Sequence, residues 1–290
     1  MFRENIKWFY LILLSLVWGS SFILINFSLK GLTPIQVGAF RILISGFVLL
    51  LVAYKSILNL TKNNWFWLSL NALLGTFFPA FLFAYAINKM DSSIAAILNS
   101  LTPLNTLLIG TLIFGYSFQK KQIFGILIGL IGTILLIYFS NEIASENKVL
   151  YMSFILIASL GYAINVNIIK RHLQEVKAIA ITTGNFTLLI IPTAIVLFFS
   201  LKYEEFTFNS VTKESLIYIC ILAIFGTAIA KTIFNKLVQI STPIFSTSVT
   251  YLIPIVAVFW GFIFGENLNI MQLFSGLIIL LGVYLVNKVK

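Results

Sequence analysis

Ten apolar stretches, each about long enough to cross a lipid bilayer as a helix, make up most of the chain. A hydrocarbon core about 30 Å thick needs roughly 20 helical residues per crossing. Runs this long without polar alternation do not match outer-membrane barrel strands, whereas helices satisfy every backbone group within the lipid. The sequence therefore predicts an all-α membrane protein with ten transmembrane helices, at residues 8–28, 34–54, 65–87, 92–114, 121–139, 149–169, 178–200, 214–236, 242–264 and 270–287.

The composition argues against a water-soluble protein. Of the 290 residues, 60% are hydrophobic and 10% are charged, with a mean hydropathy of +1.03, which lies far outside the range of soluble domains. The net charge of +10 would indicate nucleic-acid binding only if it formed a basic patch on a soluble face. The breaks between apolar stretches are too short for a soluble domain, so we expect membrane lipids and no nucleic acid as partners.

Lysine and arginine are unevenly distributed between alternate breaks, and positively charged loops resist translocation. If the N-terminus is cytoplasmic, that side holds 12 of the 19 basic residues and the far side five, while Arg41 and Lys231 lie within predicted helices. Seven of the nine acidic residues fall on the far side. We therefore expect a multi-pass protein with both termini in the cytoplasm.

The two halves of the chain resemble each other in the spacing of their prolines and glycines. The matched positions are Pro103 with Pro254, Gly110 with Gly261, and Gly75-Thr76 with Gly226-Thr227. Each half holds five predicted crossings, and an odd number turns the second half upside down relative to the first. The sequence thus predicts two inverted five-helix repeats, at residues 1–140 and 149–288.

Several motifs follow one another along nearly the whole chain: VWGSSF at 17–22, the spacing from Pro34 to Arg41, and PIVAVFWGFIFGE at 254–266. In order and spacing they resemble the EamA-type branch of the drug/metabolite transporter superfamily. This resemblance implies ten helices, a cavity between the halves, and export or exchange of small metabolites by alternating access. We expect a carrier for amino acids or related amphiphiles, without a cofactor, as a monomer or homodimer in a bacterial inner membrane.

Pro103 and Pro254 lie inside two corresponding apolar stretches, each preceded by polar residues. A proline within a transmembrane helix removes a hydrogen bond and leaves a carbonyl that needs a partner or a cavity. We interpret both prolines as hinges that line the translocation path. The alternative is close helix packing with Ser and Thr hydrogen bonds.

Ionisable residues inside a membrane are costly, so Arg41 and Lys231 are candidates for function. Arg41 is expected to be mainly structural, because the resemblance places an arginine here in relatives of every substrate type. Lys231 either extends to the inner surface or lines the cavity. Glu266 follows Gly265 at the predicted outer end of a helix, where we expect it to stabilise the turn.

Aromatic, amide and hydroxyl groups complete the predicted cavity, and together they suit an amphiphilic or zwitterionic metabolite better than a bare ion. The predicted substrate-binding residues are Trp18, Phe78, Asn99, Tyr162, Asn165, Lys231, Thr250 and Tyr251. Each alone is also typical of ordinary bundle packing.

Small residues mark the fifth and tenth apolar stretches, where Gly125, Gly129, Gly132 and Gly282 lie. Small residues at helical spacing let two backbones approach closely. We assign these stretches to a packing or dimer seam and not to the substrate site.

Other classes of protein are less consistent with the sequence. The chain lacks paired intramembrane carboxylates and an H-E-x-x-H metal motif, so catalysis is not expected. No repeated filter sequence indicates a channel. A lipid scramblase or scaffolding protein remains the alternative to a carrier. Because no Asp, Glu or His lies within a predicted helix away from its ends, we expect facilitated diffusion or exchange, with Lys231 as the one exception that could couple transport to protons.

Overall fold

The computed structural model describes residues 2–117, 119–139, 148–204, 206–265 and 270–287, and these parts of the chain contain helices and no strand. Eight helical segments are long and apolar enough to cross a membrane. The predicted all-α, multi-pass fold is therefore confirmed, while the number of ten crossings stays a prediction. The helices are α1 (Phe2–Ser28), α2 (Pro34–Ala53), η1 (Tyr54–Ile57), α3 (Lys62–Ala72), η2 (Leu73–Phe77), α4 (Phe78–Ile87), α5 (Ser92–Asn99), α6 (Thr102–Leu112), α7 (Lys120–Tyr138), α8 (Lys148–His172), α9 (Ala178–Tyr203), α10 (Ser210–Ile221), η3 (Leu222–Ile229), α11 (Ala230–Ile240), α12 (Pro243–Thr247), α13 (Val249–Ile263) and α14 (Ile270–Asn287).

Local signals explain where several helices begin. Thr33 caps α2 in a capping box with Gln36, and Pro34 occupies the first turn, where its missing N–H costs nothing. Thr242 caps α12 by accepting a hydrogen bond from the backbone N–H of Phe245, and Pro243 begins the helix. These starts fix where α2 and α12 leave their preceding loops.

Two of the long helical segments change to π-helix near their middle. Residues Leu73–Phe77 form η2 between α3 and α4, and Leu222–Ile229 form η3 between α10 and α11. A π-helical turn shifts the hydrogen bonds from i+4 to i+5 and is often found at functional sites. Both turns contain the Gly-Thr pair that the two halves share, Gly75-Thr76 and Gly226-Thr227.

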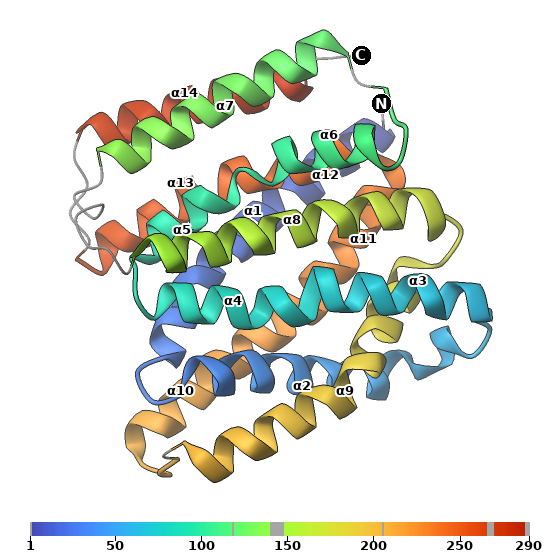
Figure 1. Cartoon of the computed structure of the whole chain (residues 1–290), viewed down its shortest axis with the longest axis vertical. Coiled ribbons are helices and arrows are strands. Elements are labelled where there is room, and N and C mark those ends of the chain that lie inside the picture. The colour runs from blue at the N-terminus through green and yellow to red at the C-terminus, as the bar shows by residue number, and fades with distance from the viewer. Residues whose placement is uncertain (1, 118, 140–147, 205, 266–269, 288–290) are drawn as a thin grey trace.

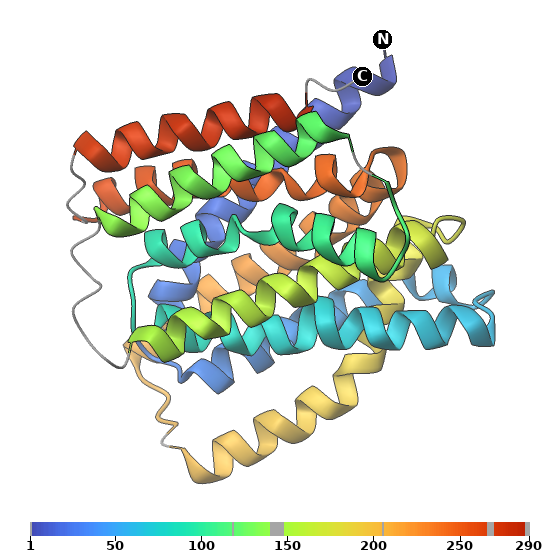
Figure 2. The same ribbon diagram turned by 45° about the horizontal axis from the view of Figure 1, so that its top comes forward.

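Most helices run roughly parallel or antiparallel in a thick bundle, and α1 and the α10–α11 segment cross the others obliquely (Figure 1). α7 lies along α14 at one edge of the bundle, and α2 lies along α9 toward the opposite edge (Figure 1). Between these pairs, α1 packs on α13 and α11, while α8 packs on α6 and α4. α1 begins and α14 ends at the same end of the bundle (Figure 2).

The seam between α7 and α14 is built from glycines. A Cβ added at Gly282 would lie 2.6 Å from the backbone N of Gly129 and 2.8 Å from the carbonyl O of Gly125. No side chain can occupy that space without moving a backbone. The prediction that small residues let these two helices pack closely is confirmed.

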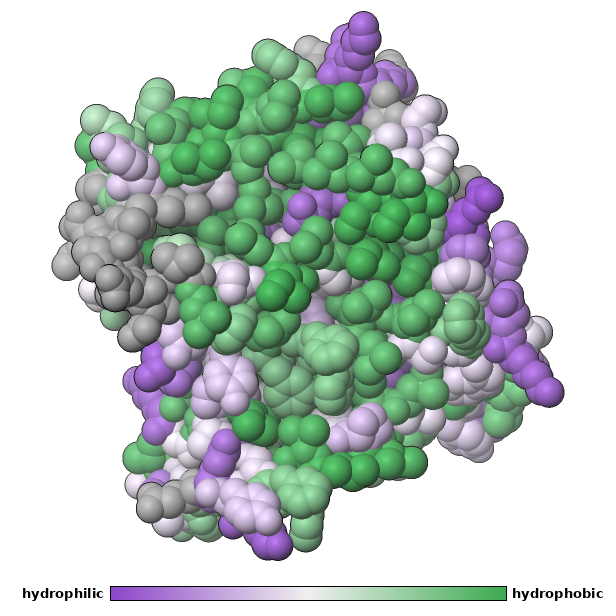
Figure 3. Space-filling model, in the orientation of Figure 1, coloured by the Kyte–Doolittle hydropathy of each residue, from purple (hydrophilic) through white to green (hydrophobic). Residues whose placement is uncertain are grey.

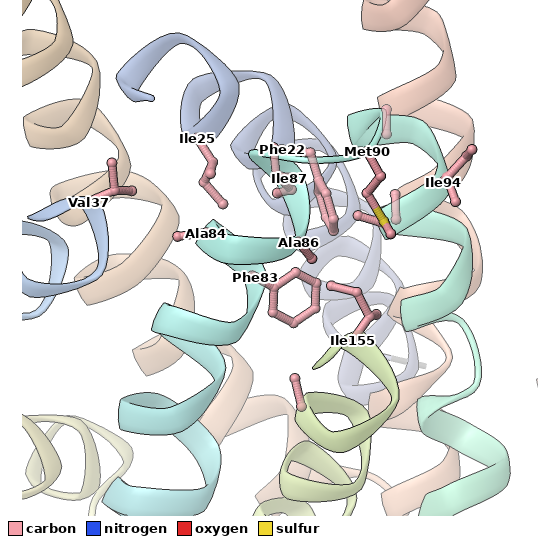
Figure 4. Packing of buried hydrophobic residues seen from close by; sticks show 14 of the residues in the cluster. Phe22, Ile25, Val37, Phe83, Ala84, Ala86, Ile87, Met90, Ile94 and Ile155 are labelled. Atoms are coloured by element: carbon pink, nitrogen blue, oxygen red, sulfur yellow. The ribbon is translucent and has the colours of Figure 1, made fainter. Parts of the chain in front are cut away.

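Apolar side chains cover the outside of the bundle as well as its interior. Figure 3 shows a hydrophobic middle zone, with hydrophilic residues gathered at the right-hand end and the lower left. Exposed large residues such as Phe47, Phe124 and Phe259 belong to this surface. Inside, Phe22 and Ile25 of α1 lie near Phe83 of α4 (Figure 4), in a cluster of buried apolar side chains. Lipid contact on the outer surface explains why it is as apolar as the core.

Candidate functional site: a polar cavity between the helices

A cavity of about 80 Å³ lies among α1, α2, α4, α5, α6, α8, α11, α12 and α13. Both halves of the chain contribute to its wall. The lining residues are Trp18, Ser21, Phe22, Ile25, Arg41, Phe83, Asn99, Thr102, Tyr162, Asn165, Val166, Lys231, Phe234, Asn235, Thr247, Thr250 and Ile253.

Most residues predicted from the sequence to bind substrate meet in this cavity. Trp18, Asn99, Tyr162, Asn165, Lys231 and Thr250 all line it. The structure thus brings them together from α1, α5, α8, α11 and α13. Their contact with a substrate stays a prediction.

Phe78 and Tyr251 lie elsewhere. Phe78 is half exposed at the start of α4 and is not among the lining residues. Tyr251 is 1% exposed and packs with Ile97 and Ile279, and its ring lies 3.0 Å from where a Cβ on Gly129 would be. Tyr251 therefore fills the space between α13 and α7, on a different face of α13 from Thr250, which lines the cavity.

Arg41 on α2 contacts the π-helical turn of the other half. Its Nε donates a hydrogen bond to Thr227 Oγ1 over 2.7 Å, and Thr227 Oγ1 in turn donates to the Leu222 carbonyl over 3.0 Å. Trp18 on α1 donates from Nε1 to the carbonyl of Gly226, over 3.0 Å. Two side chains of the first half thus hold η3.

Lys231 on α11 makes the reciprocal contact. Its Nζ donates to the carbonyl of Gly75 and to Thr76 Oγ1, both in η2. Between the two expectations for Lys231, the structure therefore places it at the cavity and not at the inner surface. Each π-helical turn thus accepts hydrogen bonds from a basic side chain of the opposite half.

Asn165 is fixed by a pair of matching hydrogen bonds with Asn71. Each amide nitrogen donates to the other residue's backbone carbonyl over 3.2 Å. Asn185 Nδ2 also donates to Asn71 Oδ1 over 2.5 Å. The Asn165 side chain packs directly on Gly75, where a Cβ would lie 1.9 Å from Nδ2. These contacts join α3, α8 and α9 behind the cavity wall.

Aromatic rings form one wall of the cavity. The ring of Phe83 meets that of Phe22 edge to face at 5.8 Å, and stacks on Tyr162 with centroids 5.9 Å apart. The ring of Trp18 lies 5.0 Å from that of Phe234. This wall gives a substrate a flat apolar surface close to the polar groups.

The two predicted hinge prolines have different positions relative to the helix breaks. Pro103 lies in the first turn of α6, directly after the break that separates it from α5. Pro254 lies inside α13, six residues beyond Ser248, where α12 ends. Both are buried, and their role as hinges stays a prediction. Glu266, the predicted turn residue, lies outside the described residues.

Sequence reasoning did not single out Ser21, Phe83, Thr102 or Asn235 for the site. Asn235 carried a usable signal, since it is a polar residue one helical turn from Lys231 and therefore on the same face of α11. Its Nδ2 donates to Thr182 Oγ1 over 3.0 Å. Phe83 had no such signal, because apolar residues surround it on every side of α4.

Two basic residues, Arg41 and Lys231, line the cavity, and none of its lining residues is acidic. Within the described ranges no group of three or more His, Cys, Asp and Glu side chains could hold a metal ion. The cavity thus offers two basic side chains, several neutral hydrogen-bonding groups and an aromatic wall.

Comparison with known proteins identifies the family. Residues 6–138 and 149–288 each match the EamA-like transporter family. A protein described as a probable amino-acid metabolite efflux pump, from Salmonella typhimurium, is 25% identical over 96% of this chain and 93% of its own. Protein PecM of Dickeya dadantii is 24% identical over 94% and 92%. A WAT1-related chloroplastic protein of Arabidopsis thaliana is 25% identical over 97% of this chain and 69% of its own.

A solved crystal structure has the same fold, with a TM-score of 0.72 at 15% identity, over 98% of this chain and 96% of that one. At this identity the similarity concerns the fold alone. The family match covers nearly all of the chain and occurs once in each half. This protein, a membrane protein whose described residues form helices around a cavity, therefore belongs to the EamA-like transporter family.

Proposed function

We propose that the protein is a carrier that moves a small organic metabolite across a bacterial inner membrane by alternating access, in the direction of export or exchange. The observation that carries the proposal is the central cavity, whose wall is shared almost equally between the two halves of the chain. A site between two repeats can open to either side as one moves against the other.

The proposed architecture is ten crossings in two inverted repeats, residues 1–140 and 149–288, with both termini cytoplasmic. The helix contacts support it, because contacts between the two halves have counterparts made by the corresponding helices of the opposite halves. α6 packs on α8 as α13 packs on α1, and α4 packs on α8 as α11 packs on α1. The π-helical turns η2 and η3 occupy matching places in the two halves.

The crossed contacts between the halves also support alternating access. Arg41 and Trp18 donate hydrogen bonds to η3, and Lys231 donates hydrogen bonds to η2. Each half therefore binds the π-helical turn of the other half. Such polar contacts can be exchanged for others at modest cost, unlike a continuous apolar interface. They are the contacts that must change when the cavity opens to the other side.

The experiment is counterflow in proteoliposomes. Vesicles containing the purified protein are loaded with one member of a panel of metabolites, and entry of the same labelled compound is followed. We expect saturable exchange of at least one compound. A variant that alters the wall, Asn235→Leu, should slow exchange, whereas Phe78→Leu, off the cavity, should leave it unchanged.

A parallel measurement separates this function from its rival. Fluorescent lipid probes are placed in one leaflet of the same vesicles, and their movement to the other leaflet is followed. Movement of the lipid probes without exchange of any solute would reject the carrier and favour a scramblase.

A further inference from the structure

We propose that the substrate is a small organic anion, with a carboxylate or phosphate head group beside Lys231 and Arg41 and an apolar remainder against the aromatic wall. This inference rests on the proposed carrier function and names the substrate class of the same cavity. It differs from the expectation of a zwitterionic amino acid in one respect: the substrate has no cationic group.

Unused donors on the two cations carry the first step. A guanidinium has five N–H donors and an ammonium has three. Among the described residues, Arg41 donates one hydrogen bond from Nε and Lys231 donates two from Nζ. All three acceptors are neutral oxygens. Donors therefore remain on both side chains at a cavity wall. Carboxylate and phosphate oxygens are the acceptors that these groups bind most strongly.

Missing counter-charge carries the second step. An ionised group inside a membrane normally pairs with another ionisable group or with backbone carbonyls. The lining of this cavity holds two basic residues and no Asp or Glu. Two like charges that face one space repel each other, and an anion between them removes that repulsion. In the proposed complex the bound solute therefore supplies the negative charge that the cavity lining lacks.

The same electrostatics disfavour a zwitterion. Its carboxylate would bind as well as that of a plain acid, but its ammonium would lie in a cavity that already holds two cations. The lining offers the ammonium only neutral oxygens, such as those of Asn99, Thr102 and Thr250. Like charges placed together reduce affinity and select against the wrong ligand.

The apolar wall defines the remainder of the substrate. Phe22, Phe83 and Tyr162 form a continuous aromatic surface, and Trp18 with Phe234 forms a second pair of rings. Rings of this kind stack on planar or branched apolar groups. We therefore infer an acid with an aromatic or branched aliphatic tail.

The test uses probes that share a tail and differ in charge: 3-phenylpropionate and phenyl phosphate as anions, phenylalanine as the zwitterion, and phenethylamine as the cation. Binding to the purified full chain in nanodiscs is measured by calorimetry, and counterflow is measured in proteoliposomes. We expect one or both anions to bind at least about ten-fold more tightly than phenylalanine, and the amine not to bind. Which anion binds distinguishes a carboxylate from a phosphate head group.

Variants of α11 localise the effect. Lys231→Met should weaken anion binding at least about ten-fold, and Lys231→Arg, which keeps the charge, should retain it. Lys236→Met removes an exposed lysine from the same helix and should change nothing. If Lys231→Met does not fold, Lys231→Arg and the probe series in the native protein still decide the question.

Two outcomes overturn the inference. Phenylalanine binding as tightly as the anions would show that the cavity does not select against a cationic group. Absence of binding by both anions would show that the cavity is not an anion site. In either case exchange of phenylalanine or another neutral solute would leave the carrier function standing, so the failures of the two proposals are distinguishable.

Discussion

Arg41 Nε donates a hydrogen bond to Thr227 Oγ1 over 2.7 Å, and this contact joins a helix of the first half to the π-helical turn of the second. Arg41 was expected to be mainly structural, and that role stays a prediction. The same side chain also lines the cavity. A residue that both contacts the other half and lines the cavity can hold the halves together and contribute to the charge of the site.

Replacing Thr227 with valine should destabilise the protein. Valine keeps the shape of the side chain but removes the acceptor for Arg41 and the donor to the Leu222 carbonyl. Leaving a buried donor or acceptor without its partner costs about 1–3 kcal/mol. The measurement is the midpoint of thermal unfolding in detergent, and Thr227→Ser, which keeps the hydroxyl, should remain close to the native protein. An unchanged midpoint in Thr227→Val would mean that Arg41 finds another acceptor.

Replacing Gly75 with alanine should also destabilise the protein, because the new Cβ would lie 1.9 Å from Asn165 Nδ2. Asn165 cannot easily move, since Asn71 holds it by two hydrogen bonds. Forcing an extra methyl group into a packed site costs about 1–3 kcal/mol. Gly276→Ala is the matched control, because nothing lies within 4 Å of its added Cβ. Equal unfolding midpoints for the two variants would contradict the close packing at Gly75.

The extents of the helices could be predicted from the sequence, because the thickness of a bilayer sets them. The stretch predicted at 34–54 is α2 at Pro34–Ala53, and the one at 178–200 is α9 at Ala178–Tyr203. The π-helical turns could not be predicted, because hydropathy does not distinguish i+4 from i+5 hydrogen bonds. Both turns lie at the repeated Gly-Thr pairs. The repeat could be seen in the sequence, but nothing in it indicated a π-helix.

The direction of side chains was harder to predict, as Phe78 and Phe83 illustrate. Five residues apart, they point about 140° away from each other around α4, since each helical residue turns about 100°. The helix is apolar all around, so nothing in the sequence says which face meets the cavity. Thr250 and Tyr251 differ for the same reason, as neighbours about 100° apart. Lys231, by contrast, could be nominated because a cation in lipid needs a polar place.

Pro103→Ala and Pro254→Ala should leave folding intact and slow exchange. Both prolines lie on helices that line the cavity. Replacing Pro254 inside α13 restores a backbone N–H to the helix, and replacing Pro103 in the first turn of α6 removes the fixed φ directly after the break from α5, so each change should alter a bend that serves motion. The measurement is the counterflow rate at matched amounts of reconstituted protein. Pro192→Ala is the control, because α9 contributes no residue to the lining. Native rates in both cavity variants would reject the hinge.

The last prediction concerns energy coupling. Proton-driven carriers hold a group within the membrane whose protonation favours one conformation over the other. The residues that line this cavity include no Asp, Glu or His. We therefore expect that, in proteoliposomes with a clamped membrane potential, an imposed pH gradient produces no accumulation of substrate above its equilibrium level. Substrate should instead follow its own gradient and, as an anion, the potential once the clamp is released. Accumulation against the gradient that disappears in folded Lys231→Met would contradict facilitated transport and make Lys231 the coupling group. Of the two basic side chains on the cavity wall, only that of Lys231 can release a proton, because an arginine side chain stays protonated.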